Sequence, residues 1–276
     1  MGRTIACANQ KGGVGKTTTV VNLASLLALA GDKILIVDLD PQGNATSGLG
    51  IDRASLEGST YDSIVDGAEL RSVILRDVND GLDVAPATIA LAGADVELAG
   101  VAARERRLRR LLEPLIDDYD VVFIDCPPSL GLLTVNALTA ADAVLIPLQS
   151  EYYALEGLTQ LLATIDLVRD HLNPRLAIEG VVVTMADART NLSADVEAEA
   201  RAHLGQTVYD TVIPRSVRLS EAPSHGKSIA AYAPESRGGL AYAALAGEFR
   251  ARNAGRDAAP LVGIPIDRTP DLVALR

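Results

Sequence analysis

The strongest constraint on the fold lies in the N-terminal segment, where a short apolar run, a glycine-rich turn and a long helical pattern follow one another. Residues 4–8 are mostly apolar, and Lys11-Gly12-Gly13-Val14-Gly15-Lys16-Thr17 begins shortly after them. Glycine lets backbone N–H groups approach a phosphate closely, and the first turn of a helix adds further donors. Lys16 supplies a cation for the β- and γ-phosphates, and Thr17 supplies a hydroxyl ligand for Mg²⁺. The segment predicts a loop that binds and hydrolyses ATP with Mg²⁺, its nucleotide-binding residues being Gly12, Gly13, Val14, Gly15, Lys16, Thr17 and Thr18.

Short apolar runs alternate with longer stretches of helical period along the rest of the chain. Several runs are apolar at nearly every position, which is typical of parallel strands buried on both faces. The alternation predicts an α/β fold with a mainly parallel, twisted sheet and helices on both faces. We expect strands at 4–8, 33–37, 82–85, 121–124, 143–147 and 178–184, and helices at 16–30, 104–116, 130–140, 155–171, 193–203 and 238–252. Residues 1–252 are expected to form a single P-loop ATPase domain, and 253–276, which is rich in Gly and Pro, an irregular tail.

The cysteines and the apolar runs limit the possible functions and locations. Cys7 and Cys126 are the two cysteines of the chain, and they form neither a disulfide framework nor a CxxC metal motif. The N-terminus lacks the long apolar region of a signal peptide. No run of about 18 apolar residues is present that could span a bilayer. We therefore expect a cytoplasmic protein.

The charge distribution restricts how the chain could bind nucleic acid. A net charge of −11 is unfavourable for a protein that covers nucleic acid with its whole surface. Basic residues are concentrated late in the chain, with nine Lys and Arg against seven Asp and Glu between Arg189 and Arg256. Aromatic residues make up only 3% of the chain, so base stacking can contribute little. Any binding of nucleic acid is expected to depend on a local basic face.

Carboxylates follow two of the predicted strands. Asp38 and Asp40 come after the second run, and Asp125 ends the run 121–124. Ligands of open α/β sheets gather at the carboxyl ends of the strands, and an acid at the end of an apolar strand commonly positions Mg²⁺ through water. Thr17, Asp40 and Asp125 are therefore the predicted metal-binding residues. The alternative is that Asp38 and Asp40 only cap a turn and that Asp125 only caps a helix.

The glycine-rich loop departs from the general pattern GxxxxGK[ST]. Gln10 stands where that pattern has its first Gly, and the pattern does not require Lys11. This loop resembles that of the ParA/MinD group of deviant Walker A ATPases, and within it the ParA/Soj partition ATPases. The resemblance is carried by 9–19, 38–44, 147–157 and 213–224.

The resemblance implies roles for individual residues. Lys11 is expected to act on the nucleotide of a partner subunit, so Lys11, Lys16 and Asp40 are the predicted catalytic residues. Asp40 would hold the attacking water, with Asp38 close to the magnesium shell. The resemblance further implies that Glu151 contacts the partner's ribose or the dimer face, and that Met185 and Pro214 face the adenine.

The resemblance also implies an ATP-dependent homodimer that binds DNA without sequence preference and is released when a ParB-type centromere-binding protein stimulates hydrolysis. Arg189 and Arg218 match the DNA-contacting positions, with Arg215 and Lys227 as helpers, and a nucleoid-associated location follows. The alternative is that these are solvated or carboxylate-paired surface residues. The alternative function is a MinD-type division-site ATPase, but residues 261–276 lack a Lys-rich amphipathic face, so no membrane is expected.

Overall fold

The computed structural model describes residues 2–79, 81–151, 154–187 and 189–254. Within them lies one seven-stranded sheet with the strand order β3-β4-β2-β5-β1-β6-β7. Every pairing is parallel except the hairpin of β3 with β4 at one edge. The strands are β1 (Arg3–Cys7), β2 (Ile34–Asp38), β3 (Leu75–Asn79), β4 (Leu82–Ala85), β5 (Val121–Asp125), β6 (Ala143–Gln149) and β7 (Ala177–Thr184). The predicted α/β class with a mainly parallel sheet is confirmed.

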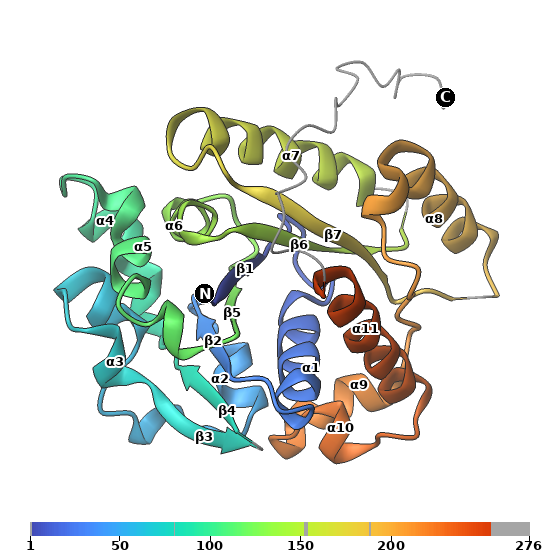
Figure 1. Ribbon diagram of the computed structural model, residues 1–276, viewed down its shortest axis with the longest axis horizontal. Coiled ribbons are helices and arrows are strands. Elements are labelled where there is room, and N and C mark those ends of the chain that lie inside the picture. Colours follow the sequence, from blue (N-terminus) through green and yellow to red (C-terminus); the bar gives the residue numbers. More distant parts are fainter. Residues whose placement is uncertain (1, 80, 152–153, 188, 255–276) are drawn as a thin grey trace.

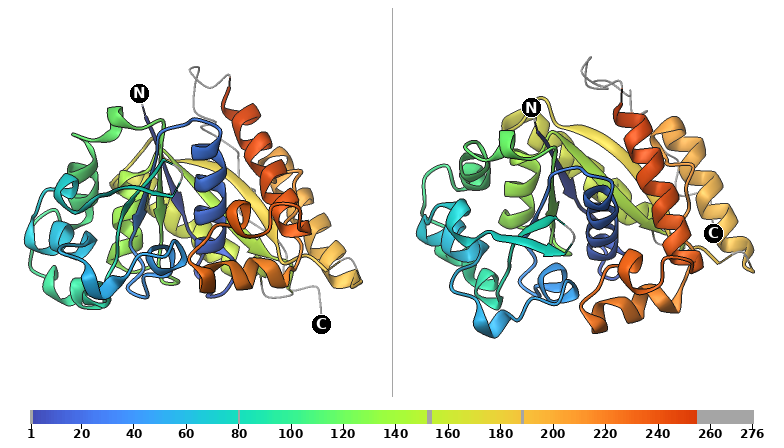
Figure 2. Two further views of the ribbon diagram at one scale, coloured as in Figure 1. Left: turned by 90° about the horizontal axis from the view of Figure 1, so that it is seen from below. Right: turned by 60° about the horizontal axis from the view of Figure 1, so that its bottom comes forward.

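Helices cover both faces of this sheet, as Figures 1 and 2 show. One face packs against α1 (Lys16–Leu29), α2 (Asn44–Gly48), α9 (Val217–Glu221), α10 (Ile229–Tyr232) and α11 (Arg237–Asn253). The other face packs against α3 (Leu70–Val73), α4 (Ala94–Glu97), α5 (Arg107–Leu112), α6 (Leu132–Ala140), α7 (Ala154–His171) and α8 (Asn191–Leu204). The central strands are buried on both sides, as the unbroken apolar runs predicted. None of the helices in the described ranges is long and apolar enough to cross a membrane.

The register of the central strands brings the ends that carry chemistry together. Cys7 at the end of β1 pairs with Asp125 at the end of β5, and Asp125 also pairs with Asp38 at the end of β2. The phosphate loop follows β1, which lies between β5 and β6 in the sheet. The predicted ligand edge of the sheet is therefore formed by neighbouring strands. The two cysteines are fully buried near it, Cys7 in the core beneath α1 and Cys126 in the core on the opposite face.

Three expectations from the sequence need correction or cannot be compared. The helix expected at 104–116 is broken into a 3₁₀ turn (Arg104–Arg106), α5 and a second 3₁₀ turn (Ile116–Asp118). Pro114 follows the end of α5, and a proline has no N–H to continue a helix. The helix expected from residue 130 begins at 132, because Gly131 is extended. Of the predicted tail, 255–276 lies outside the described residues.

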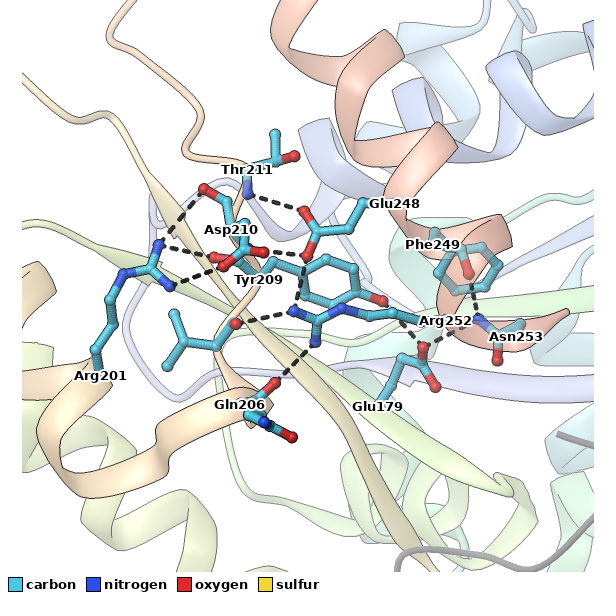
Figure 3. A network of polar contacts seen from close by, with 11 residues as sticks. Glu179, Arg201, Gln206, Tyr209, Asp210, Thr211, Glu248, Phe249, Arg252 and Asn253 are labelled. Carbon is cyan, nitrogen blue, oxygen red and sulfur yellow. Dashed lines mark hydrogen bonds and ion pairs between the residues drawn. The ribbon is translucent and has the colours of Figure 1, made fainter. Parts of the chain in front are cut away.

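A polar network joins the end of α11 to β7 and to the segment that follows α8 (Figure 3). The guanidinium carbon of Arg252 lies 4.0 Å from the ring centroid of Tyr209. The carboxylate of Glu248 accepts hydrogen bonds of 2.8 Å from two backbone N–H groups, those of residues 210 and 211. Asn253 donates to the buried carboxylate of Glu179 on β7 at 3.1 Å. These contacts fix the last turn of α11 on the sheet and hold the segment 208–213, which leads into the predicted adenine and DNA residues.

Candidate active site

The phosphate loop is shaped by glycines in backbone conformations that other residues rarely adopt. Gly13 has a φ of 75° and Gly15, at the N-cap of α1, has a φ of 91°. A side chain at either position would be strained, whereas Gly allows the turn. The loop is also tied to the sheet, because the Thr184 hydroxyl at the end of β7 donates to the Val14 carbonyl at 2.8 Å. Backbone N–H groups at the start of a helix, such as those of α1, are suited to bind an anion.

The two lysines of the loop have different surroundings. The Lys16 side chain is buried along the loop, and its ammonium donates to the carbonyl of Lys11 at 3.2 Å. The Lys11 ammonium instead lies 2.6 Å from a carboxylate oxygen of Glu151, in the turn after β6. The other oxygen of Glu151 accepts from the Gln149 amide at 2.6 Å. Lys16 therefore lies along the inner side of the loop, and Lys11 is held at its outer side.

The carboxylate of Asp125 lies under the start of α1 and is fully buried. One of its oxygens accepts a 2.7 Å hydrogen bond from the Thr17 hydroxyl, and the other has no hydrogen-bond partner among the described residues. Burial, and then the neighbouring carboxylate of Asp38, raise the pKa of Asp125 well above its ordinary value. A buried carboxylate of this kind is energetically unfavourable unless a cation or a proton joins it.

The segment after β2 contains the other two carboxylates. Asp38 is buried and accepts hydrogen bonds from the hydroxyl and backbone N–H of Thr46, at 2.7 and 2.9 Å. Burial raises the pKa of Asp38 to about 6, although the bonds from Thr46 oppose the shift. Asp40 accepts from the Gln42 backbone N–H at 2.9 Å with one oxygen. Asp38 thus holds the turn to α2 in place, and Asp40 lies at its start.

The donor set of this edge fits a magnesium ion. Thr17 offers a hydroxyl, and the carboxylate of Asp125 has an oxygen with no partner in the described ranges. In those ranges no group of three or more His, Cys, Asp and Glu side chains forms a metal site by itself. This arrangement is compatible with Mg²⁺, which usually binds one or two protein carboxylates and completes its shell with phosphate oxygens and water.

The predicted adenine residues lie on two segments that run side by side. Met185 follows β7 and has a φ of 54°, a left-handed conformation that is unusual for a residue with a side chain. Ala186 pairs with Pro214 in an isolated parallel bridge. Met185 also accepts a 3.4 Å hydrogen bond at its carbonyl from the Ser150 hydroxyl. The structure therefore brings Met185, Pro214 and the turn containing Glu151 to one end of β6 and β7.

The four predicted DNA-contacting residues are exposed, and two of them are paired with carboxylates. Arg189 precedes α8, Arg215 follows the bridge to Ala186, Arg218 lies in α9, and Lys227 follows the turn after α9. Arg189 contacts Asp187 at 2.6 Å, and Arg218 contacts Glu221 at 2.8 Å. The carboxylate-paired alternative therefore describes Arg189 and Arg218 in this structure.

Three residues that support the loop and the carboxylates were not predicted from the sequence. The Asn9 amide donates to the Pro147 carbonyl at 2.8 Å, and its oxygen accepts from the Lys11 backbone N–H at 3.0 Å. Thr184 supports Val14, and Thr46 supports Asp38, as described above. Thr184 is 170 positions from its partner Val14, so it offered no local signal. Asn9, immediately before the loop, and Thr46, eight positions after its partner Asp38, did offer one. Thr18 in α1 uses its carbonyl to accept from the Asn22 amide at 2.7 Å.

Comparison with known proteins places this arrangement in a family. A family model described as an AAA domain matches residues 2–178. The chain is 59% identical over 251 residues to the sporulation initiation inhibitor protein Soj of Bacillus subtilis, covering 91% of this chain and 99% of that protein. It is 52% identical over 258 residues to the chromosome partitioning protein ParA of Caulobacter vibrioides, covering 93% of this chain and 97% of that protein.

A solved structure supports the ligand assignment. Cobyrinic acid a,c-diamide synthase from Mycobacterium smegmatis, with bound ADP and magnesium, matches this fold with a TM-score of 0.81 and 39% sequence identity, covering 95% of this chain and 100% of that one. A second structure of that synthase contains an ATP analogue and magnesium. This chain shares more than half of its aligned residues with the partition proteins Soj and ParA, over nine-tenths of its own length. It therefore belongs to the ParA/Soj family of DNA-partitioning ATPases.

Proposed function

We propose that ATP closes two copies of this chain into a sandwich dimer that binds DNA without sequence preference. A ParB-type centromere-binding protein then stimulates hydrolysis, the dimer opens and the DNA is released. The two basic faces act together only in the dimer, because joining them rigidly raises the effective concentration of the second face. ATP is therefore the switch between a nucleoid-bound form and a free form, and the cargo follows the changing boundary of bound ATPase.

Within the site, we assign the reaction to three residues. Lys16 binds the β- and γ-phosphates from inside the loop, and Asp40 holds the attacking water. Lys11 reaches the nucleotide of the partner subunit and stabilises the charge that develops on the transferred phosphoryl group. Thr17 and, through water, Asp40 and Asp125 would hold Mg²⁺, which would supply positive charge to neutralise the phosphates.

The position of Lys11 is the observation that carries this proposal. Its ammonium is 2.6 Å from Glu151, and its side chain keeps 34% of its exposure. Lys16 donates to the backbone carbonyl of Lys11, whereas the Lys11 ammonium lies beside Glu151, so its charge is directed away from the inner side of the loop. A lysine at the outer side of a phosphate loop is available to a second subunit. Glu151, which lies beside it, is correspondingly a residue of the dimer face.

Two adjacent segments support a link between nucleotide and DNA. Met185 and Pro214, the proposed adenine contacts, are joined by the bridge at Ala186. Arg189 and Arg215 continue from the same two segments. A movement of either segment on nucleotide binding therefore moves a proposed DNA-contacting arginine. Arg218 and Lys227 follow Arg215 along the chain, in α9 and after the turn that ends it.

Co-sedimentation with duplex DNA in the presence of ATP, ADP or no nucleotide tests the proposal. We expect binding only with ATP, of similar strength on unrelated sequences, and with a salt dependence of roughly −0.9 per phosphate neutralised. Arg189→Ala and Arg218→Ala should weaken binding to all sequences alike. Arg71→Ala is the matched control, since Arg71 is an exposed, carboxylate-paired arginine of α3, a helix that lies near the β3 edge of the sheet (Figure 1). Equal binding without ATP, or sequence-selective binding, contradicts the proposal.

A parallel experiment with lipid vesicles separates the MinD-type alternative. Vesicles that contain anionic lipid replace the DNA, and the same three nucleotide conditions are used. We expect no ATP-dependent binding to vesicles. ATP-dependent binding to vesicles with none to DNA would replace the partition function by a division-site function at the membrane.

A further inference from the structure

Two of the proposed DNA-contacting arginines are already bound to a carboxylate of the same chain. These are Arg189, paired with Asp187, and Arg218, paired with Glu221. Each partner lies two or three positions away in sequence, so the contact forms without a second subunit and persists in any state in which the local backbone is kept. A guanidinium fork binds a carboxylate and a phosphate in the same bidentate geometry.

The pair of Arg189 with Asp187 uses the Nε and Nη2 edge of the guanidinium. Arg189 donates from Nε to one oxygen of Asp187 at 2.8 Å and from Nη2 to the other at 2.6 Å. Its backbone N–H donates to the same carboxylate at 3.1 Å. The hydrogen bonds from Arg189 hold the pKa of this carboxyl well below its usual range, and the positive charge of Arg215 adds to the shift. Two of the proposed DNA-contacting arginines, Arg189 and Arg215, thus act on Asp187.

The pair of Arg218 with Glu221 is built differently but has the same effect. Nη1 of Arg218 lies 2.8 Å from a carboxylate oxygen of Glu221 one turn further along α9. The same oxygen accepts a 3.2 Å hydrogen bond from the Tyr232 hydroxyl, and the Tyr232 ring stacks on His225. Glu221 is therefore held in place from two sides. The Arg218 side chain keeps 58% of its exposure, so a phosphate can reach it from solvent.

We infer that Asp187 and Glu221 are built-in competitors of DNA phosphate, which set the strength of DNA binding and speed its release. This inference rests on the proposed function, because it requires that Arg189 and Arg218 contact DNA. When Arg189 or Arg218 contacts a phosphate, the arginine gives up its own carboxylate partner. Binding therefore replaces one ionic contact by another and does not add a contact to an unpaired arginine. When the dimer opens, each arginine returns to its own carboxylate, so the separated subunits compete poorly for DNA.

The size of the effect follows from the exposure of the pairs. Exposed ion pairs are weak, and two copies of each act in a dimer, so removing one of these carboxylates should tighten DNA binding about 2- to 30-fold at low salt. The gain should shrink as the salt concentration rises, because exposed charges are screened. The dissociation rate should fall in the same variants, since the competitor for the arginine is gone.

Titrations of fluorescent duplex DNA with protein and MgATP test this inference through Asp187→Asn and Glu221→Gln. Asp118→Asn is the matched control, because it also removes one negative charge and also frees an exposed arginine, Arg71, which lies 2.7 Å away. We expect tighter binding and slower dissociation for the first two variants and unchanged binding for the control. In the double variant Asp187→Asn with Arg189→Ala, the gain should disappear, since it acts through that arginine.

The outcomes separate this inference from the function on which it rests. Wild-type affinity in both carboxylate variants, while Arg189→Ala and Arg218→Ala still weaken binding, overturns the inference alone. Equal tightening in Asp118→Asn also overturns it, because overall charge would then explain the effect. Absence of ATP-dependent DNA binding by the wild-type protein contradicts the proposed function and the inference together.

Discussion

Replacing Asp125 by asparagine should change stability and nucleotide binding in opposite directions. Asp125 is fully buried, and one of its oxygens has no hydrogen-bond partner among the described residues. Asparagine has nearly the same shape, keeps an oxygen that accepts from Thr17, and removes the charge. A buried unsatisfied polar group costs about 1–3 kcal/mol, and more if it is charged. Because the amide still lacks a second partner, we expect Asp125→Asn to stabilise the nucleotide-free protein by about 1–2 kcal/mol, or a rise of about 2–8 °C in Tm.

The pH dependence of this gain has a definite sign. Burial and the Asp38 carboxylate raise the pKa of Asp125, so the folded protein binds this proton more tightly than the unfolded chain does. An aspartate in an unfolded chain has a pKa of about 4. The wild-type protein therefore loses stability as the pH rises above that value. Asp125→Asn has no carboxyl at this position, so its stability does not fall for this reason. The gain should be absent below about pH 4 and should grow as the pH rises.

Thermal unfolding followed by circular dichroism, with and without MgATP, measures both effects. A ligand at about 100 times its Kd stabilises the folded state by about 2.7 kcal/mol, and Asp125→Asn should lose most of this shift because its magnesium ligand is weakened. Asp142→Asn is the control, since Asp142 accepts from the Thr4 backbone N–H at the start of the strands, away from the site. A nucleotide-free Asp125→Asn protein less stable than wild type at pH 8, or one with the full MgATP shift, would refute this reasoning.

Three further predictions concern the loop and the adenine end. Gly12→Val should fold and bind ATP, because a Cβ at Gly12 meets the Pro128 Cβ at an ordinary contact distance of 3.9 Å. It should fail to pair, because the branched side chain would intrude where the loops of two subunits meet; normal ATP-dependent dimers in light scattering would count against this. Asp40→Ala should retain ATP binding but stop hydrolysis, and mixtures of Asp40→Ala with Lys11→Ala subunits should show whether one site uses a lysine from the other; turnover that follows each subunit's own mutation would disprove action in trans. Met185→Asn should raise the free energy of unfolding by up to about 1 kcal/mol, because Asn tolerates the left-handed conformation, whereas Met185→Ile should lower it. Equal denaturation midpoints for the two Met185 variants would show that the conformation carries no strain.

Most strands could be predicted from the sequence because each is an unbroken apolar run. The run 121–124 is an example, since a strand buried on both faces needs apolar residues at successive positions. The strand β3 was missed because its sequence, LRDVN, is largely polar and half exposed at the sheet edge. Such a strand depends on pairing with β4, and nothing in its own five residues requires it. The break of the helix after Leu112 was missed although Pro114 is a local signal.

The site was predictable to the extent that its residues are adjacent in sequence. The phosphate loop is a continuous segment, so its glycines and Lys16 could be assigned without knowing the fold. The pairing of Lys11 with Glu151 joins residues 140 positions apart, and the bond from Thr184 to Val14 spans 170. Contacts of this length depend on how β6 pairs with β1 and β7 with β6, which no local pattern encodes. The left-handed Met185 belongs to the same class, because its conformation is set by the bridge next to it.

The burial of both cysteines makes the chain suitable for selective labelling in solution. Cys7 and Cys126 have no exposed surface, and burial raises the pKa of both thiols, so neither supplies the thiolate that reacts with maleimides. A cysteine introduced at an exposed position outside the site, such as Asp117→Cys, is then the reactive thiol of the folded protein. A donor dye on one batch of subunits and an acceptor dye on another would report subunit pairing through energy transfer. The native sequence thus permits the ATP cycle to be followed in real time without removal of any natural thiol.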